Sequence, residues 1–460
     1  MKKRFLSFFA AFAVLVAMTG CRQSPEPPPN IVIIFLDDSG WADFEPFGEK
    51  LLETPGVAQL AAEGCAFHNF YVPQAVCSAS RSALMSGCYP GRTKVFGAHG
   101  PNAWGLDTTF ATMGEVFSAA GYATAAFGKW HCGDTPETRS HARGFDETCG
   151  LMYSNDMWKY HPGNPEYWGQ WPLSFWENGE VVIGEVEKSD QRNLTRWYTE
   201  HAVDFIRRHG DTPFLLYVPH SMPHVPLFCS EAFEGKSGKG LYGDVILEID
   251  WSIGQINQAL KEAGVERNTI MVLTSDNGPW ISYGNHAGST PFREAKGTSF
   301  DGGVRSACIM KYPGKIEAGT VSTRTFGSVD LLPTLCHAAG IPLPDNEIDG
   351  ENVWELVTGV SGAVNPHAYY AFSNAARFEG VMSGDGKWKL HLPHPYRTLE
   401  SPGKDGLPGK YSTAEIDTAL FDMEHDPLET TNVIDRYPEV ARKLAGIAGM
   451  HRERFYPEQE

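Results

Sequence analysis

Two apolar runs that each end in acidic or amide side chains constrain the fold of this chain most strongly. The first occupies residues 30–36 and is followed directly by Asp-Asp, and the second occupies residues 269–275 and is followed by Asp-Asn. An unbroken apolar strand is buried on both faces, as strands of a parallel sheet are. Ligands of open α/β sheets collect at the carboxyl ends of such strands. We therefore expect the two strand ends to border one site.

The polar residues at these strand ends form a set of oxygen ligands. They are Asp37, Asp38, Asp276 and Asn277. Adjacent carboxylates repel each other strongly unless a cation lies between them. Carboxylate and amide oxygens are hard ligands that suit calcium. An N-cap role is an alternative for a single Asp, but two strand ends that converge on such a set favour a calcium site.

A cysteine enters a Ser- and Ala-rich segment at residues 76–87, and Arg81 follows Cys77 after three residues. The helical spacing of the apolar residues that follow places Cys77 near a helix N-terminus, where backbone N–H groups and the helix dipole favour negative charge. We interpret this as an anion site. Taken alone, the pattern is more typical of a buried structural cysteine beside a helix cap, so the rest of the chain must decide.

Two further segments place basic side chains after predicted strands. A strand expected at 121–127 leads to Lys129 and His131, which are two residues apart and so face the same side of an extended chain. A buried strand at 213–218 leads to His220 and His224 among three prolines. A single histidine there is more often a core residue, but two favour a functional site.

Taken together, these motifs resemble those of the type I sulfatases of the alkaline phosphatase superfamily, in particular arylsulfatases and N-acetylgalactosamine sulfatases. The resemblance extends from residue 30 to about residue 440 and includes Gly91-Arg92, Leu-Tyr-Gly-Asp at 241–244 and the segment 292–305. It implies one calcium ion and conversion of Cys77 to formylglycine by a maturation enzyme. Ala79 stands where the family's usual Cys-x-Pro-x-Arg pattern has proline. This departure bears on how efficiently the maturation enzyme converts Cys77 to formylglycine.

The resemblance also implies catalytic roles for six residues. They are Cys77, Arg81, Lys129, His131, His224 and Lys296. In the implied mechanism the cations neutralise the sulfate, and a hydroxyl of hydrated formylglycine attacks sulfur. His224 and Lys296 assist the leaving alcohol, and His131 helps to expel sulfate and restore the aldehyde. His224 is favoured over His220 because it precedes Val-Pro.

The fold that the resemblance implies is an α/β fold of the alkaline phosphatase type, with a large mixed sheet between helices. We expect the catalytic domain at 30–360 and a C-terminal subdomain at 361–460. Short strand candidates at 369–372, 380–392 and 419–422, with a helix at 438–454, predict a small antiparallel sheet in that subdomain. A Pro-rich stretch with His391 and His394 is expected to form a surface loop, with contact to the substrate as the alternative.

The N-terminus predicts export. Residues 1–20 combine basic residues with an apolar run that is too short to span a membrane, and Met-Thr-Gly-Cys resembles a bacterial lipobox ending at Cys21. Residues 21–29 then form a Pro-rich tether. We expect a lipid-anchored protein in the periplasm or at the cell surface of a bacterium; a plain signal peptide is the alternative.

The net charge argues against some classes of partner. The net charge of −18 argues against nucleic acid and anionic membranes, so the membrane is expected as a partner only through the lipid anchor.

Besides Cys21 and Cys77 the chain has seven cysteines, an odd number without zinc spacing. Cys132 and Cys149 are a candidate pair, and buried free thiols are the default expectation.

The substrate class rests on an aromatic insertion at 152–196, which includes Trp158, Trp168 and Trp171. Such side chains stack on sugar rings, so we predict a sulfated carbohydrate as substrate; an insertion that packs on its own core is equally compatible. Three other functions stay open. They are a phosphonate or phosphate-ester hydrolase of the same superfamily, an enzyme that uses unmodified Cys77, and a non-catalytic glycan-binding surface lipoprotein.

Overall fold

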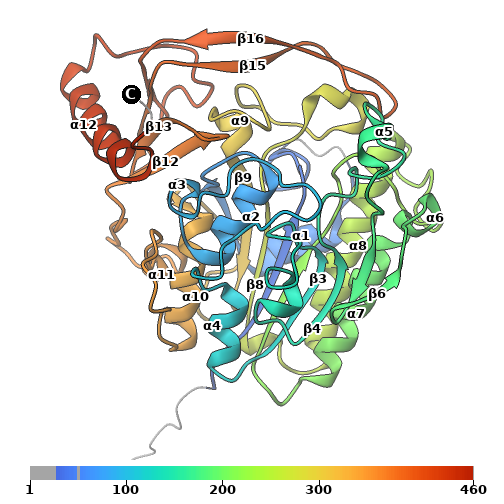
Figure 1. Ribbon diagram of the computed structural model, residues 1–460. Coiled ribbons are helices and arrows are strands. Elements are labelled where there is room, and N and C mark those ends of the chain that lie inside the picture. Colours follow the sequence, from blue (N-terminus) through green and yellow to red (C-terminus); the bar gives the residue numbers. More distant parts are fainter. Residues whose placement is uncertain (1–26, 49–51, 459–460) are drawn as a thin grey trace, which may run out of the picture.

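The structure is a computed structural model that describes residues 27–48 and 52–458 (Figure 1). The predicted signal segment, the lipobox with Cys21 and most of the tether lie outside the described residues. Within the described part of the chain, no helix combines the length and apolar character needed to cross a membrane.

The described residues form one large mixed sheet of eleven strands. Ten of them follow the order β10-β2-β9-β8-β1-β7-β3-β4-β5-β6, and β11 pairs with β2. The strands are β1 (Asn30–Leu36), β2 (Cys65–Tyr71), β3 (Ala123–Lys129), β4 (Glu147–Leu151), β5 (Phe175–Glu177), β6 (Glu180–Ile183), β7 (Phe214–Pro219), β8 (Thr269–Ser275), β9 (Arg305–Lys311), β10 (Thr320–Ser322) and β11 (Phe326–Gly327). The five central strands from β8 to β4 are parallel, whereas β9 and β5 pair antiparallel with their neighbours.

Helices cover both faces of this sheet, with α7 and α8 on one side and α2, α4 and α10 on the other (Figure 1). The α-helices are α1 (Pro55–Glu63), α2 (Cys77–Ser86), α3 (Pro90–Thr93), α4 (Met113–Ala119), α5 (Pro165–Trp168), α6 (Lys188–Gln191), α7 (Leu194–Arg208), α8 (Gly240–Glu262), α9 (Asp301–Val304), α10 (Leu331–Ala339), α11 (Trp354–Val357) and α12 (Pro438–Phe455). Short 3₁₀ turns are η1 (Ser140–Ala142), η2 (Glu266–Asn268), η3 (Ile281–His286) and η4 (Ser328–Asp330).

The C-terminal part forms a second, antiparallel sheet in the order β12-β13-β14-β17, packed against α12. Its strands are β12 (Tyr369–Asn374), β13 (Arg377–Ser383), β14 (Trp388–His391) and β17 (Ala419–Asp422). A separate hairpin of β15 (His394–Ser401) and β16 (Lys410–Ile416) reaches across the top of the molecule toward α5 (Figure 1). The predicted fold class is therefore confirmed, and the hairpin is an addition that we did not predict.

The hydrophobic core continues from the large sheet into the C-terminal part. Tyr370 and Phe372 of β12 belong to the same buried cluster as the strands of the large sheet. A second cluster joins Ala83 of α2 to Leu444 of α12. The two sheets therefore share packing, which holds the C-terminal part firmly beside the carboxyl ends of the central strands.

Two expectations about exposure were wrong. His391 and His394 do not lie in a surface loop: they end β14 and begin β15, are 1% and 4% exposed, and face the buried carboxylates of Glu429 and Glu379. Trp158 is 2% exposed and packs against Phe228, so it is a core residue that no sugar ring can stack on. Burial inside the subdomain and the insertion, which no local pattern reveals, is the reason in both cases.

The default expectation for the cysteines agrees with the structure. All eight described cysteines, Cys132 and Cys149 included, are buried free thiols.

Candidate active site

The four predicted metal ligands lie side by side because β1 and β8 are neighbouring parallel strands in register. Leu36 pairs with Ser275, so the residues that follow emerge at the same edge of the sheet. All four are at most 3% exposed. The backbone N–H of Asp38 donates to Asp276 Oδ1 at 3.1 Å, and Asn277 Nδ2 donates to Asp38 Oδ1 at 2.7 Å.

Each of the three carboxylates has a cationic partner from another part of the chain. Arg81 donates to Asp276 Oδ2 through Nε at 3.1 Å and Nη2 at 2.9 Å. Lys129 of β3 pairs with Asp37, and Lys296 Nζ lies 2.6 Å from Asp38 Oδ1. Buried charges need such partners because water no longer solvates them. Three of the predicted catalytic residues thus surround the predicted metal ligands.

The carboxyls of this cluster respond unequally to their surroundings. Burial raises the pKa of the Asp37 carboxyl, but Lys129 and the other nearby cations outweigh burial and hold it well below its usual range. Burial and the adjacent Asp37 carboxylate raise the pKa of Asp276. A further cation beside these oxygens would favour the ionised form of Asp276.

The donor set fits a hard divalent cation. Asn277 Oδ1 is buried and has no hydrogen-bond partner among the described residues, although buried amide oxygens are normally satisfied. Ligand atoms of Asp37 and Asp38 lie within 4.8 Å of each other and of those of Cys77 and His224. Carboxylate and amide oxygens are the ligands that calcium and magnesium prefer.

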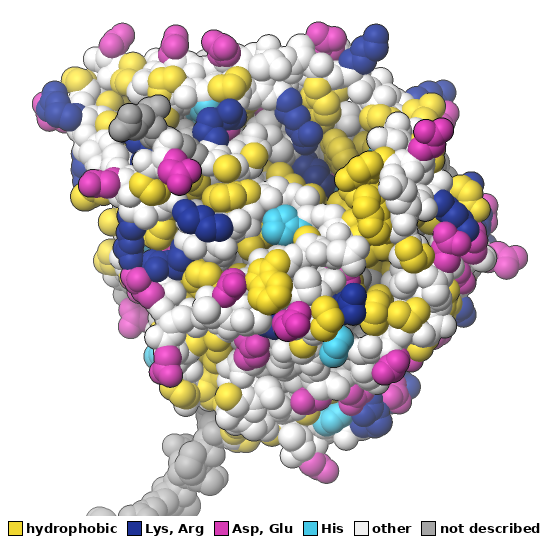
Figure 2. Space-filling view, in the orientation of Figure 1, with side chains coloured by type: hydrophobic (Ala, Val, Ile, Leu, Met, Phe, Trp, Pro, Cys, Tyr) yellow, Lys and Arg dark blue, Asp and Glu magenta, His cyan; other side chains and the backbone are white. Residues whose placement is uncertain are grey.

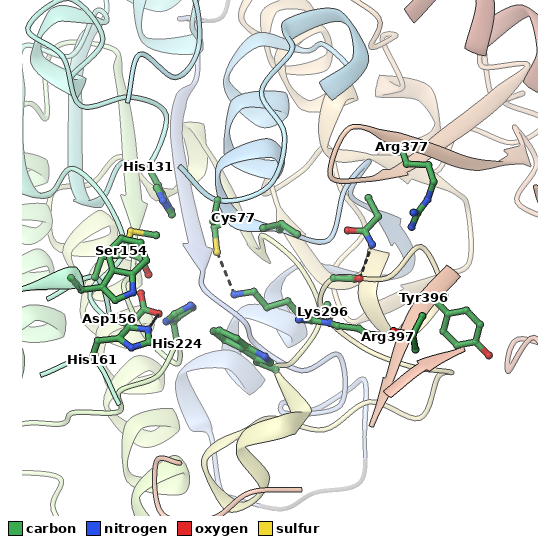
Figure 3. Close-up of a pocket in the computed structure, with 18 of the residues that line it drawn as sticks. Cys77, His131, Ser154, Asp156, His161, His224, Lys296, Arg377, Tyr396 and Arg397 are labelled. Carbon is green, nitrogen blue, oxygen red and sulfur yellow. Dashed lines mark hydrogen bonds and ion pairs between the residues drawn. The ribbon is translucent and has the colours of Figure 1, made fainter. Parts of the chain in front are cut away.

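Cys77 is the first residue of α2, at the bottom of a pocket that opens beside the cluster (Figure 3). Its Sγ lies 3.4 Å from both Asp37 Oδ1 and Lys296 Nζ, and the residue is 1% exposed. Burial, and then the Asp37 charge, raise the pKa of the Cys77 thiol, so it carries a proton that it donates to Asp37. Ala79 N–H donates to the carbonyl of Gly97 at 3.2 Å, a bond that the family's proline would lack.

The two predicted histidines both line the pocket and have defined tautomers. His131 Nε2 donates to the carbonyl of His99 at 2.8 Å, which leaves Nδ1 as a free acceptor. His224 Nδ1 donates to the carbonyl of Val225 at 2.5 Å, and its Nε2 lies 3.6 Å from Asp38 Oδ2. Burial and the neighbouring lysines lower the pKa of both imidazoles, which are therefore neutral at neutral pH.

His220 does not belong to this site. It is fully buried, its Nε2 contacts Ser252 Oγ at 3.2 Å, and it does not line the pocket. Of the two histidines in the Pro-rich segment, only His224 reaches the site, because β7 ends just before His220 and the chain then turns toward the pocket.

The pocket holds about 580 Å³ and is also lined by residues that sequence reasoning missed. Ser154 accepts a hydrogen bond from Lys129 Nζ at 3.1 Å, and the Trp280 ring lies 4.5 Å from Lys296 Nζ. Asp156 and His161 come from the insertion, and Arg377 and Arg397 come from β13 and β15. Trp168 is the predicted stacking residue that does line the pocket. The aromatic composition of the insertion was the only feature of the sequence that pointed to any of these additional lining residues.

Comparison with known proteins gives one consistent result. The family model described as Sulfatase matches residues 29–341. N-acetylgalactosamine-6-sulfatase of Mus musculus is 33% identical, with 97% of this chain and 90% of that protein covered, and arylsulfatase A of Bos taurus is 33% identical over 90% and 85%. The crystal structure of the PsFucS1 sulfatase from Pseudoalteromonas sp. superposes with a TM-score of 0.83 at 23% identity, covering 93% and 91% of the two chains.

Proposed function

Because this chain belongs to the sulfatase family and is a sulfuric ester hydrolase, we propose that it cleaves sulfate esters of carbohydrates with a nucleophile derived from Cys77. The carrying observation is the position of Cys77 at the bottom of the pocket, within 3.4 Å of Lys296 Nζ and beside three cations. The relatives named N-acetylgalactosamine-6-sulfatase act on a sulfated sugar by their name, which supports a carbohydrate substrate.

The nucleophile that we propose is formylglycine at position 77. Its hydrated aldehyde supplies a hydroxyl that attacks sulfur and a second hydroxyl whose deprotonation releases sulfate. A modified rather than a free cysteine is supported because burial and the Asp37 charge raise the pKa of the Cys77 thiol, and a protonated thiol is a weak nucleophile.

For the metal we propose one calcium ion held by Asp37, Asp38, Asp276 and Asn277. When bound, it supplies positive charge beside the sulfate oxygens. Arg81 and Lys129 hold Asp276 and Asp37 in place and add to the positive field around the sulfate.

Proton transfer is assigned to three residues that line the pocket. Lys296 Nζ faces Sγ and donates a proton to the leaving alcohol. His224 assists only after Nε2 has bound a proton, because its Nδ1 hydrogen is committed to the Val225 carbonyl. His131 accepts the proton of the second hydroxyl at Nδ1, which has no other partner among the described residues.

Three measurements test this function. Peptide mass spectrometry of protein from a host with a maturation enzyme should show formylglycine at position 77, and Cys77→Ala should lose turnover of every sulfate ester. A panel of sulfated sugars, a small aryl sulfate and an aryl phosphate then identifies the substrate class. Active protein with only unmodified thiol contradicts the nucleophile, and preference for the phosphate favours the phosphate-ester alternative.

A further inference from the structure

The two walls of the pocket differ in charge. Asp156, His161 and Trp168 come from the insertion, whereas Arg377 and Arg397 come from the C-terminal strands. Figure 3 shows Asp156 and His161 on one side and Arg377 and Arg397 on the other, with Cys77 and Lys296 between them. In the space-filling view, Lys and Arg side chains and hydrophobic side chains border a hollow below the β15–β16 hairpin (Figure 2).

Arg397 is held by contacts that leave its charge available. Its Nε donates to the carbonyl of Lys296 at 3.0 Å, Nη2 donates to the same oxygen, and the guanidinium lies 4.7 Å from the Tyr411 ring centre. Among the described residues no carboxylate forms an ion pair with it. The charge of Arg397 favours the ionised form of Glu294, but Glu294 lies beyond ion-pair distance. Nη1 makes no hydrogen bond to the described residues, and Arg397 lines the pocket.

Arg377 is oriented from behind by a buried carboxylate. Nε and Nη2 donate to Glu379 Oε1 at 3.1 and 2.5 Å, and Nη2 also donates to the carbonyl of Pro395 at 2.8 Å. The Glu379 side chain is fully buried, while that of Arg377 is 40% exposed. The pair therefore fixes one edge of the guanidinium, and Nη1 makes no hydrogen bond to the described residues.

We propose that Arg397 and Arg377 form a subsite for a second anionic group of the substrate, either a sulfate or a carboxylate. Guanidinium groups bind such oxyanions through paired N–H donors. Asp156 is the only carboxylate among the residues that line the pocket, and it lies on the opposite wall. The preferred substrate is therefore a sulfated sugar that carries another negative charge, and this inference rests on the proposed function.

The opposite wall orients the same substrate. Asp156 Oδ1 is buried without a hydrogen-bond partner among the described residues, so it is available to accept a sugar hydroxyl. Its negative charge repels an anionic substituent. A sugar whose sulfate ester reaches Cys77 thus binds with hydroxyls toward Asp156 and its second anion toward Arg397. A pocket of about 580 Å³ is within the range that holds ligands larger than a sulfate ion.

The test compares three matched substrates: a sugar with one sulfate, the same sugar with a second sulfate, and the singly sulfated sugar linked to a uronic acid. Arg377→Gln should lower kcat/KM for a doubly anionic substrate roughly ten- to hundredfold more than for the singly sulfated sugar, mainly through KM. Arg377→Lys, which keeps the charge, should recover part of the loss. Arg442→Gln, an exposed arginine of α12, is the control and should change neither.

Comparing the second sulfate with the uronate identifies the anion, and binding to Cys77→Ala gives a readout that needs no turnover. In that background, Arg377→Gln should weaken the doubly anionic sugar and spare the singly sulfated one. Equal effects on all three substrates, or tighter binding of the singly sulfated sugar, overturn the subsite while leaving a sulfatase. Failure of the wild type to cleave any sulfated sugar instead rejects the proposed carbohydrate function.

Discussion

At the scale of single residues, the site is a balance of three buried carboxylates against three buried cations. Arg81 is tied to Asp276 by two hydrogen bonds, whereas Asn277 is neutral and contacts only Asp38 and the backbone nearby. Asp276 and Asn277 therefore differ in what their removal does, although both are proposed ligands of the same ion. Comparing substitutions of the two residues therefore separates the loss of a metal ligand from the loss of a charge partner.

Asn277→Ala should weaken calcium binding roughly tenfold or more with little loss of stability, because it removes one ligand and unpairs no charge. Activity should recover when calcium is added in excess. Titration of activity against free calcium after chelation, together with the metal content, measures the effect.

Asp276→Ala is the comparison variant, because it also leaves Arg81 buried without its carboxylate. It should lower the free energy of unfolding by about 3–5 kcal/mol, and added calcium should not restore it. If Asn277→Ala keeps the calcium dependence of the wild type, Asn277 is not a ligand.

Trp168 is the insertion tryptophan that lines the pocket, and Trp171 does not line it. Trp168→Ala should raise KM for a sulfated sugar roughly tenfold more than KM for a small aryl sulfate, because only the sugar extends to that wall. Trp171→Ala should show a much smaller difference between the two substrates. Steady-state kinetics on both substrates decide this, and equal losses for Trp168→Ala would make the residue structural.

At the scale of elements, α12 and the small sheet bury histidines as neutral groups. His451 of α12 packs against Tyr89, Phe378 and Phe455, and burial lowers its pKa to about 3. Burial likewise lowers the pKa of His391 in β14 to about 4. Both lie in the C-terminal part that carries Arg377 and Arg397, so their protonation in acid acts on the elements that form that wall.

The free energy of unfolding should fall as pH drops below about 6.5, because the unfolded chain then binds protons that the folded His451 does not. Stability from this residue is complete above pH 6.5 and is lost progressively down to about pH 3. His451→Phe should reduce the decline by roughly 2–4 kcal/mol across that range. Denaturant unfolding at several pH values measures it, and an unchanged slope would contradict the assignment.

At the scale of the whole molecule, the catalytic edge of the large sheet is closed by chain from its C-terminal end. The β15–β16 hairpin reaches over the carboxyl ends of the central strands toward α5 (Figure 1). The predicted lipid anchor belongs to the N-terminal segment outside the described residues, so it stays a prediction. We propose that the protein is exported and tethered to a membrane through Cys21.

Cys21→Ser should move the protein from the membrane fraction to the soluble fraction of a bacterial host. Its kcat/KM on a soluble substrate should stay within about twofold of the wild type, because the change removes only the anchor. Fractionation followed by immunoblotting measures the distribution. A wild type that is already soluble would favour a plain signal peptide.

The sequence by itself determined where the main buried strands lie along the chain and that Asp37, Asp38, Asp276 and Asn277 meet at their carboxyl ends. Each of these features has a signal within one short segment of sequence. A strand buried on both faces appears as one apolar run, and the side chains that follow it emerge at the sheet edge. Lys129 is the last residue of β3, and His131 and His224 follow the ends of β3 and β7. The resemblance to sulfatases then assigned roles that spacing alone does not.

Only the tertiary structure decided which segments of the chain line the pocket. Pro395 argues against a strand, yet β15 forms because a two-stranded hairpin has free edges where a missing N–H costs nothing. Arg397 meets the carbonyl of Lys296 across 101 residues, and Trp158 and His391 are buried against Phe228 and Phe300, which are also distant along the chain. Contacts between segments so far apart leave no local pattern, because each depends on where other segments fold.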